Sequence, residues 1–217
     1  MLVVSNTSPI LNLAIIGQLG LLRNQFEQIH IPQAVLDELC ISEDLPGVKA
    51  VRQAIKDDWI KIVQAREQNL AQAIGRDLDR GEAESIALAL QLKADLILLD
   101  ERDGRQVAKA IDLNVTGVFG VLLKARRAGR LVSLRQAIDD LREQAGFRIH
   151  PSLLAELQSL PEYQDSWKPR QRVAETRQQY GEPAKNWAHR RRARKVDLNL
   201  DANPPTSQTR RQGPRKL

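Results

Sequence analysis

Four residues of this sequence stand where side chains could carry out metal-assisted chemistry: Asn6, Glu38, Glu82 and Asp100. Asn6 ends a short β-branched run, and Asp100 directly follows the apolar residues 96–99. Acids gathered in one cleft repel one another unless a cation neutralises them, and Mg²⁺ or Mn²⁺ is the natural partner of an all-oxygen site. Such an ion activates water and offsets charge on a transferring phosphoryl group, which is what phosphodiester cleavage needs.

Each acid also has a simpler structural explanation. Glu38 could be a solvated residue of a helix, and Glu82 could merely favour a helix N-terminus through the helix dipole. Asp100 is harder to explain in this way, because an acid that follows a buried strand must emerge at the sheet edge or find a partner. Residues of the same loop could provide that partner: Glu101, Arg102 and Asp103. Spacing alone therefore leaves both explanations open.

The elements that would position these residues alternate along the chain. Apolar runs predict strands over residues 2–5, 27–31, 59–63, 94–99 and 114–118. Helical periodicity predicts helices over residues 9–15, 32–39, 48–55, 82–93, 105–111, 119–128, 134–145 and 151–160. The first of these should have Ser8 as its N-cap and Pro9 at its first position. This alternation is typical of an α/β fold with a parallel sheet, where ligands bind at the carboxyl ends of the strands.

The composition fits one domain with additional material. The chain has 217 residues, 42% of them hydrophobic but only 4% aromatic, so its core must consist mainly of aliphatic side chains. A single cysteine, Cys40, excludes an intramolecular disulfide framework. We find neither a secretory signal pattern nor a long apolar run, and so expect a cytoplasmic protein. No phosphate-binding glycine loop follows any predicted strand, which argues against a nucleotide cofactor, and the three histidines form no pair at metal-ligand spacing.

Charge divides the chain near residue 160. Residues 161–217 hold 14 Lys and Arg against 6 Asp and Glu, whereas residues 1–160 hold 19 against 21. We therefore predict a folded, mildly acidic domain over residues 1–160 and a basic extension of low order over residues 161–217. The extension contains a cluster of basic residues that either contact RNA phosphates or are simply solvated: Arg190, Arg191, Arg192, Arg194 and Lys195.

Four separate segments, residues 3–10, 31–39, 81–89 and 94–102, resemble the PIN domain. More narrowly, they resemble its bacterial and archaeal subgroup of uncharacterised nucleic-acid-binding proteins, which is related to the toxins of toxin–antitoxin pairs. The similarity extends to about residue 160. It implies a parallel sheet flanked by helices on both faces, and the basic tail, which we expect to be disordered from its composition, lies beyond the resemblance. It also implies an Mg²⁺- or Mn²⁺-dependent ribonuclease acting on single-stranded RNA, usually a homodimer inhibited by a small antitoxin.

Carried over position by position, the acids of the family fall on Asn6, Glu38, Glu82 and Asp100. The resemblance further implies a supporting hydroxyl at Thr7 or Ser8 and an additional metal-shell acid at Asp103. Asn6 departs from the pattern: its amide oxygen can bind a cation but brings no charge, so a module that binds nucleic acid with weak or no catalysis is the alternative. A phospho-acceptor receiver domain ranks last, since it needs a pair of acids after the first strand.

Overall fold

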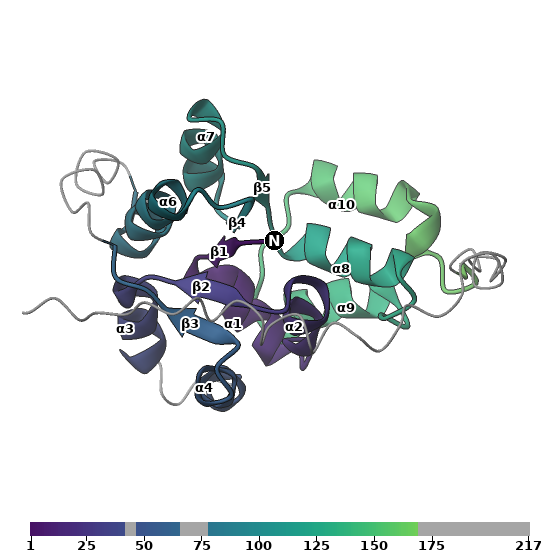
Figure 1. The fold of residues 1–217 in the computed structure, drawn as a ribbon. Helices are drawn as coiled ribbons and strands as arrows, with labels where there is room; N and C mark the ends of the chain where they lie inside the picture. Colours follow the sequence, from purple (N-terminus) through teal and green to yellow (C-terminus); the bar gives the residue numbers. More distant parts are fainter. Residues whose placement is uncertain (42–46, 66–77, 169–217) are drawn as a thin grey trace, which may run out of the picture. The chain divides into compact units, whose positions relative to one another are not determined.

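Five short strands form one parallel sheet in the computed structural model, in the order β3-β2-β1-β4-β5 (Figure 1). The structure describes residues 1–41, 47–65 and 78–168. The strands are β1 (Val3–Ser5), β2 (Ile29–Ile31), β3 (Ile60–Ile62), β4 (Leu96–Leu98) and β5 (Val115–Thr116). Each lies inside a predicted strand. The basic residues 190–195 and the rest of the predicted extension beyond residue 168 lie outside the described residues.

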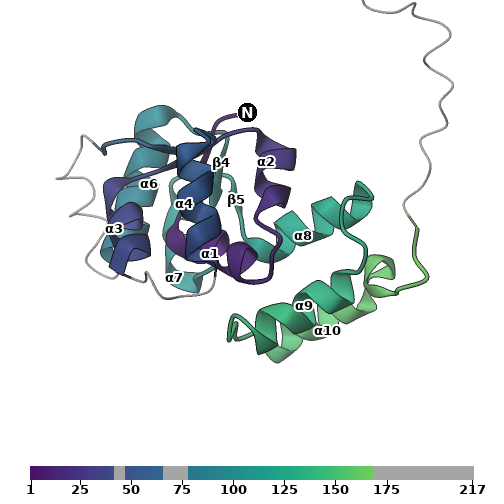
Figure 2. The ribbon, with the colours of Figure 1, turned by 90° about the horizontal axis from the view of Figure 1, so that it is seen from below.

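The helices connect these strands and continue after them (Figure 2). Their bounds are α1 (Thr7–Ile15), α2 (Gly20–Phe26), α3 (Gln33–Ile41), α4 (Val48–Lys56), α6 (Arg80–Leu92), α7 (Arg102–Ala110), α8 (Val118–Arg127), α9 (Leu134–Glu143) and α10 (Pro151–Ser159). A short 3₁₀ turn, η1 (Pro161–Tyr163), follows α10. No helix in the described ranges is long and apolar enough to cross a membrane.

Helices cover the sheet on both faces, as the side chains of β1 show. Val3 and Val4 are both fully buried, but they belong to different apolar clusters because successive side chains of a strand point to opposite faces. Val3 packs with residues of α1, α2, α3, α4, α8 and α9. Val4 packs with residues of α6 and α7. The predicted fold class, an α/β parallel sheet flanked by helices on both faces, is confirmed.

Two local predictions were wrong. Helix α2 was not predicted, because its glycine start carries no capping signal; burial of Leu21, Leu22 and Phe26 stabilises it instead. The N-cap of α1 is Asn6 and not Ser8, with an extended backbone at φ −79° and ψ 173°. Pro9 is tolerated further inside the helix than predicted, because the first four N–H groups of a helix have no intrahelical partner.

Ordered structure continues past residue 160 through a buried arginine. Arg126 in α8 is only 6% exposed, and each of its five N–H groups donates to a backbone carbonyl. The acceptors are the carbonyls of Leu131, Val132, Glu162, Gln164 and Trp167. One side chain thus ties α8 to the loop after it and to the segment around η1.

Candidate metal centre at the carboxyl edge of the sheet

Asn6 and Asp100 are brought together by the pairing of β1 with β4. Ser5 of β1 lies opposite Leu98 of β4, and the Asn6 N–H donates to the Leu98 carbonyl at 3.1 Å. The residues that follow these two neighbouring parallel strands must therefore emerge at the same edge of the sheet. This is the arrangement that the sequence predicted for an α/β binding site.

The side chain of Asn6 is buried without a partner for its oxygen. An asparagine N-cap ordinarily accepts the N–H of the second or third helical residue, but Asn6 makes no such bond, and the third residue here is Pro9, which has no N–H. Asn6 is 3% exposed, and its Oδ1 atom has no hydrogen-bond partner. A buried amide oxygen of this kind costs free energy unless something binds it.

Glu82 reaches the same edge from the first turn of α6. Asp79 is the N-cap of this helix, and its Oδ1 accepts the Glu82 N–H at 2.6 Å. Glu82 is 3% exposed, and its Oε1 atom also lacks a hydrogen-bond partner. The carboxylate lies directly against Gly104 of α7, where a Cβ atom would collide with it. Glycine at this position therefore lets α7 approach the carboxylate.

Glu38 lies between the starts of α1 and α6. The Thr7 hydroxyl, one of the two predicted supporting hydroxyls, donates to Glu38 Oε2. The Glu38 carboxylate also packs against Gly81, again without room for a Cβ atom. Ser8, the other supporting candidate, hydrogen-bonds Glu101. The two hydroxyls of α1 therefore hold two different carboxylates.

Asp100 uses its two carboxylate oxygens differently. Oδ1 accepts the Val118 N–H at the start of α8 at 2.8 Å, and the side chain of Asn12 also hydrogen-bonds the carboxylate. Oδ2 is buried and has no hydrogen-bond partner. One oxygen is thus fixed by the fold while the other remains available to a ligand.

Asp79 and Glu101 are acids that sequence reasoning did not select. One carboxylate oxygen from each of Asp79, Glu82 and Glu101 lies within 4.8 Å of the other two, which is close enough for a shared metal ion. Of the predicted acids, only Glu82 belongs to this trio. Two signals were available: Asp79 stands three residues before Glu82, as an N-cap does, and Glu101 is adjacent to Asp100.

Electrostatics connect this trio to the remaining predicted acids. The charges of Glu38 and Asp103 both raise the pKa of Glu101, and the charge of Glu101 raises that of Asp100. Asp103 itself is exposed in the first turn of α7. These charges therefore link the acids into one group, called the acidic cluster below: Asp79, Glu82, Asp100 and Glu101, with Glu38 and Asp103 at its periphery.

Two of these carboxyls hold their protons unusually well. The pKa of Glu82 is raised from 4.5 to about 7, first by burial and then by the charges of Glu101, Asp79 and Asp103. Burial raises the pKa of Asp100 from 3.8 to about 6, although the Val118 N–H, Asn12 and Arg105 act in the opposite direction. Burial also raises the pKa of Glu101. A bound cation would relieve these costs, because it favours the ionised form of each acid.

Helix N-termini supply the positive potential of the site. The N-cap residues of α1, α6, α7 and α8 are Asn6, Asp79, Glu101 and Gly117. Asp79 and Glu101 belong to the trio, Gly117 lies against Asp100, and Asn6 follows β1 at the same edge of the sheet. The positive ends of these helix dipoles favour carboxylates, and they also favour an anionic phosphate brought to the same place.

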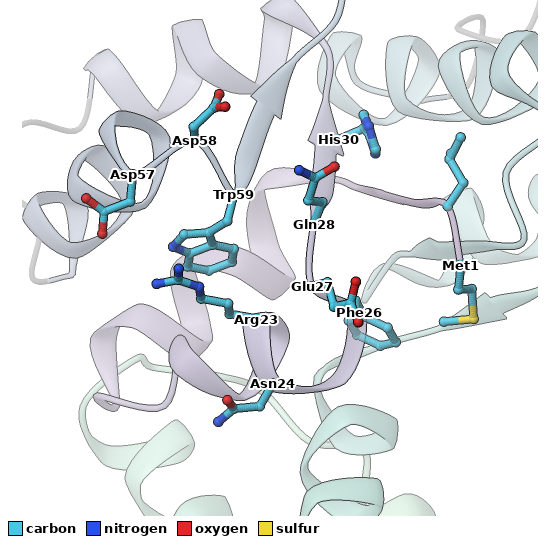
Figure 3. Close-up of a pocket in the computed structure, with 11 residues that line it drawn as sticks. Met1, Arg23, Asn24, Phe26, Glu27, Gln28, His30, Asp57, Asp58 and Trp59 are labelled. Atoms are coloured by element: carbon cyan, nitrogen blue, oxygen red, sulfur yellow. The ribbon is translucent and has the colours of Figure 1, made fainter. Parts of the chain in front are cut away.

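A groove of about 930 Å³ lies at the opposite edge of the sheet (Figure 3). Among the residues that line it are Met1, Gln28 and Trp59, which precede β1, β2 and β3. The groove is thus built at the amino ends of the strands, and none of the clustered acids lines it. We do not assign it to the candidate metal centre.

Comparison with known proteins agrees with this geometry. A search of curated proteins gave no match. A family model, DUF3368, which is described as a PIN domain, matches residues 2–162. The matched range contains Asn6 and every residue of the acidic cluster. The chain therefore belongs to the PIN-domain family and has the fold of a nuclease.

Proposed function

We propose that this chain is a metal-dependent endoribonuclease that cleaves single-stranded RNA. The observation that carries the proposal is the group of buried oxygens without hydrogen-bond partners at the carboxyl edge of the sheet: Asn6 Oδ1, Glu82 Oε1 and Asp100 Oδ2. Such atoms are uncommon in native folds, and these are three of the six found among the described residues. Membership of the PIN-domain family, a family of nuclease fold, supports the same conclusion.

These residues fit a hard divalent cation. The donors are all oxygens, and the carboxylates of Asp79, Glu82 and Glu101 approach one another closely enough to share an ion. We propose that Glu82, Asp100, Asp79 and Glu101 hold Mg²⁺ or Mn²⁺, with the amide oxygen of Asn6 as a neutral ligand and Glu38 and Asp103 acting nearby. When bound, the ion would supply Lewis acidity toward the phosphate and toward water.

The chain itself orients these groups for catalysis. Thr7 and Ser8 hold Glu38 and Glu101, and the Val118 N–H holds Asp100. Near pH 7, Glu82 with its pKa of about 7 is only partly ionised, whereas Asp100 with its pKa of about 6 is mostly ionised. Metal binding should therefore release protons chiefly from Glu82. The N-termini of α1 and α7 would attract the phosphate of a strand laid across this edge.

A nucleic-acid-binding module with weak catalysis is the second candidate. It is favoured by Asn6, which places an amide where the family resemblance implies a carboxylate. Against this candidate stand Asp79 and Glu101, which return negative charge to the cluster. We therefore rank the active nuclease first.

We further propose the partners that the resemblance implied: a single-stranded RNA substrate, a second copy of the chain in a homodimer, and a small antitoxin. A toxin role predicts that induced expression arrests growth, and that Asp100→Asn relieves the arrest. Equal arrest by wild type and variant would contradict the toxin role.

Cleavage of end-labelled single-stranded RNA with added Mg²⁺ or Mn²⁺ tests the enzymatic activity. We expect the wild type to cleave, a chelator to stop it, and Asp100→Asn to lose at least about 100-fold in rate, since it removes a proposed ligand. Asp139→Asn on α9 is the matched control, because that acid pairs only with nearby arginines among the described residues. RNA binding without cleavage at either metal would favour the second candidate.

A further inference from the structure

Asp100 is held by neighbours that do not themselves belong to the acidic cluster. The Nη1 atom of Arg105 in α7 donates to the carbonyl of Leu99 at 2.9 Å, on the residue immediately before Asp100. The Leu99 N–H in turn donates to the Thr116 carbonyl of β5 at 2.9 Å. Arg105 therefore anchors the turn between β4 and α7 at the point where Asp100 leaves the sheet.

Gly117 shows how tightly these groups are packed. A Cβ atom on this residue would lie 2.5 Å from Asp100 Oδ1, 2.9 Å from the Leu99 carbonyl and 3.1 Å from Arg105 Nη1. The backbone at Gly117 is extended, with φ −138°, so close approach and not an unusual conformation requires glycine. The guanidinium, the carboxylate and the start of α8 thus meet at one point.

The positive charge of Arg105 also stabilises the Asp100 carboxylate. It favours the ionised form of Asp100 and so opposes the effect of burial on the pKa. Among the described residues, the Leu99 carbonyl is the only hydrogen-bond acceptor of the Arg105 side chain, and Asp100 Oδ2 remains without a hydrogen-bond partner. The arginine thus supports the carboxylate without occupying its free oxygen.

We infer that Arg105 is a positioning residue of the proposed metal centre: it fixes the turn that carries Asp100, so that Oδ1 stays bound to α8 and Oδ2 faces the ion. The inference rests on the proposed function. Residues that orient metal ligands from behind commonly matter for metal affinity almost as much as the ligands do.

Titration of the full chain with Mn²⁺ by calorimetry tests the inference without an activity assay. We expect Arg105→Met to weaken Mn²⁺ binding by about 10- to 100-fold. Arg105→Lys keeps the charge but loses the planar fork, so its loss should be smaller, about 3- to 10-fold. Arg135→Met on α9 is the control, since that side chain is exposed and pairs within its own helix.

The melting temperature without metal separates positioning from a purely structural role. A variant that melts earlier but binds Mn²⁺ like the wild type, well below its melting temperature, would overturn the inference. Should Arg105→Met fail to fold, Arg105→Lys provides the test. Mn²⁺ affinity equal to that of the wild type would overturn the inference, and the smaller loss expected for this variant would support it. If the wild type itself binds neither Mn²⁺ nor Mg²⁺, the proposed function fails as well, whereas binding by wild type and variants alike refutes only the role of Arg105.

Discussion

Arg126 and Glu82 are both buried and both ionisable, yet the fold surrounds them in opposite ways. Arg126 donates every one of its N–H groups to a carbonyl, and its guanidinium lies 5.0 Å from the ring of Trp167. Glu82 lies among other acids and leaves Oε1 without a partner. Burying a charge is costly in either place, but the fold pairs every N–H of Arg126, whereas it leaves the Glu82 carboxylate among like charges.

Neighbouring carboxyls repeat this contrast. Glu162, beside Arg126, pairs through Oε1 with Arg127 at 2.7 Å, and that hydrogen bond lowers its pKa, although its Oε2 has no hydrogen-bond partner. Glu82 and Asp100 have raised pKa values of about 7 and about 6. The region around α8 and η1 therefore resembles a structural ion-pair network, whereas the carboxyl edge of the sheet has the uncompensated electrostatics of a functional site.

The largest effect on stability should come from removing Arg126. Arg126→Met leaves five carbonyls without their donor, and we expect a loss of about 3 to 5 kcal/mol in the free energy of unfolding. Denaturant titration measures this loss, with the exposed Arg135→Met as control. The affinity for Mn²⁺ should not change, because Arg126 lies outside the acidic cluster. A fall in Mn²⁺ affinity as large as that expected for Arg105→Met would contradict the conclusion that the two regions are independent.

The second effect is a dependence of stability on pH, without metal, set by the acidic cluster. Since the pKa of Glu82 is raised in the folded state, its contribution to stability is fully present below pH 4.5 and is lost as the pH rises through about 7. At about 1.4 kcal/mol per pKa unit, the loss is on the order of 3 kcal/mol.

Chemical denaturation at pH 5 and pH 8 measures this dependence. Glu82→Gln should flatten it, and saturating Mn²⁺ should restore stability at pH 8, because the ion replaces the proton. The contribution of Glu162 to stability depends on pH in the opposite way. Because its pKa is lowered in the folded state, this contribution is lost as the pH falls through the acidic range. If Glu82→Gln and the wild type have equal free energies of unfolding at both pH values, Glu82 is not the electrostatically unfavourable group that we infer.

The smallest effect concerns Asn6. Asn6→Asp adds a carboxylate at an oxygen position that has no partner, so Mn²⁺ affinity should rise roughly tenfold, or about 1.4 kcal/mol. Stability without metal should fall by about 1 kcal/mol, because another acid joins a crowded cluster. Asn24→Asp, at the groove on the opposite edge, is the matched control. If Asn6→Asp changes neither quantity, Asn6 serves only as the N-cap of α1.

The sequence was sufficient to predict the strand positions and the neighbourhood of Asn6 and Asp100, because an apolar run that ends in a polar residue identifies the end of a buried strand. It was not sufficient for Asp79 and Glu101. Their approach to Glu82 depends on how the starts of α6 and α7 pack against each other across Gly104, which is a tertiary contact without a local pattern. Helix α2 was missed for a similar reason, since packing and not propensity stabilises it.

Gly81 and Gly104 give the acidic cluster an unusual mutational profile. Each contacts the end of a flexible carboxylate side chain, Glu38 at Gly81 and Glu82 at Gly104, so an alanine could be accommodated if that carboxylate swung away. The fold would survive such a substitution at little cost, while the displaced oxygen would no longer serve the site. Saturation mutagenesis scored for both abundance and function should therefore show that substitutions at these two glycines leave the abundance of the protein nearly unchanged but abolish its proposed function. Neither glycine has a side chain able to do chemistry.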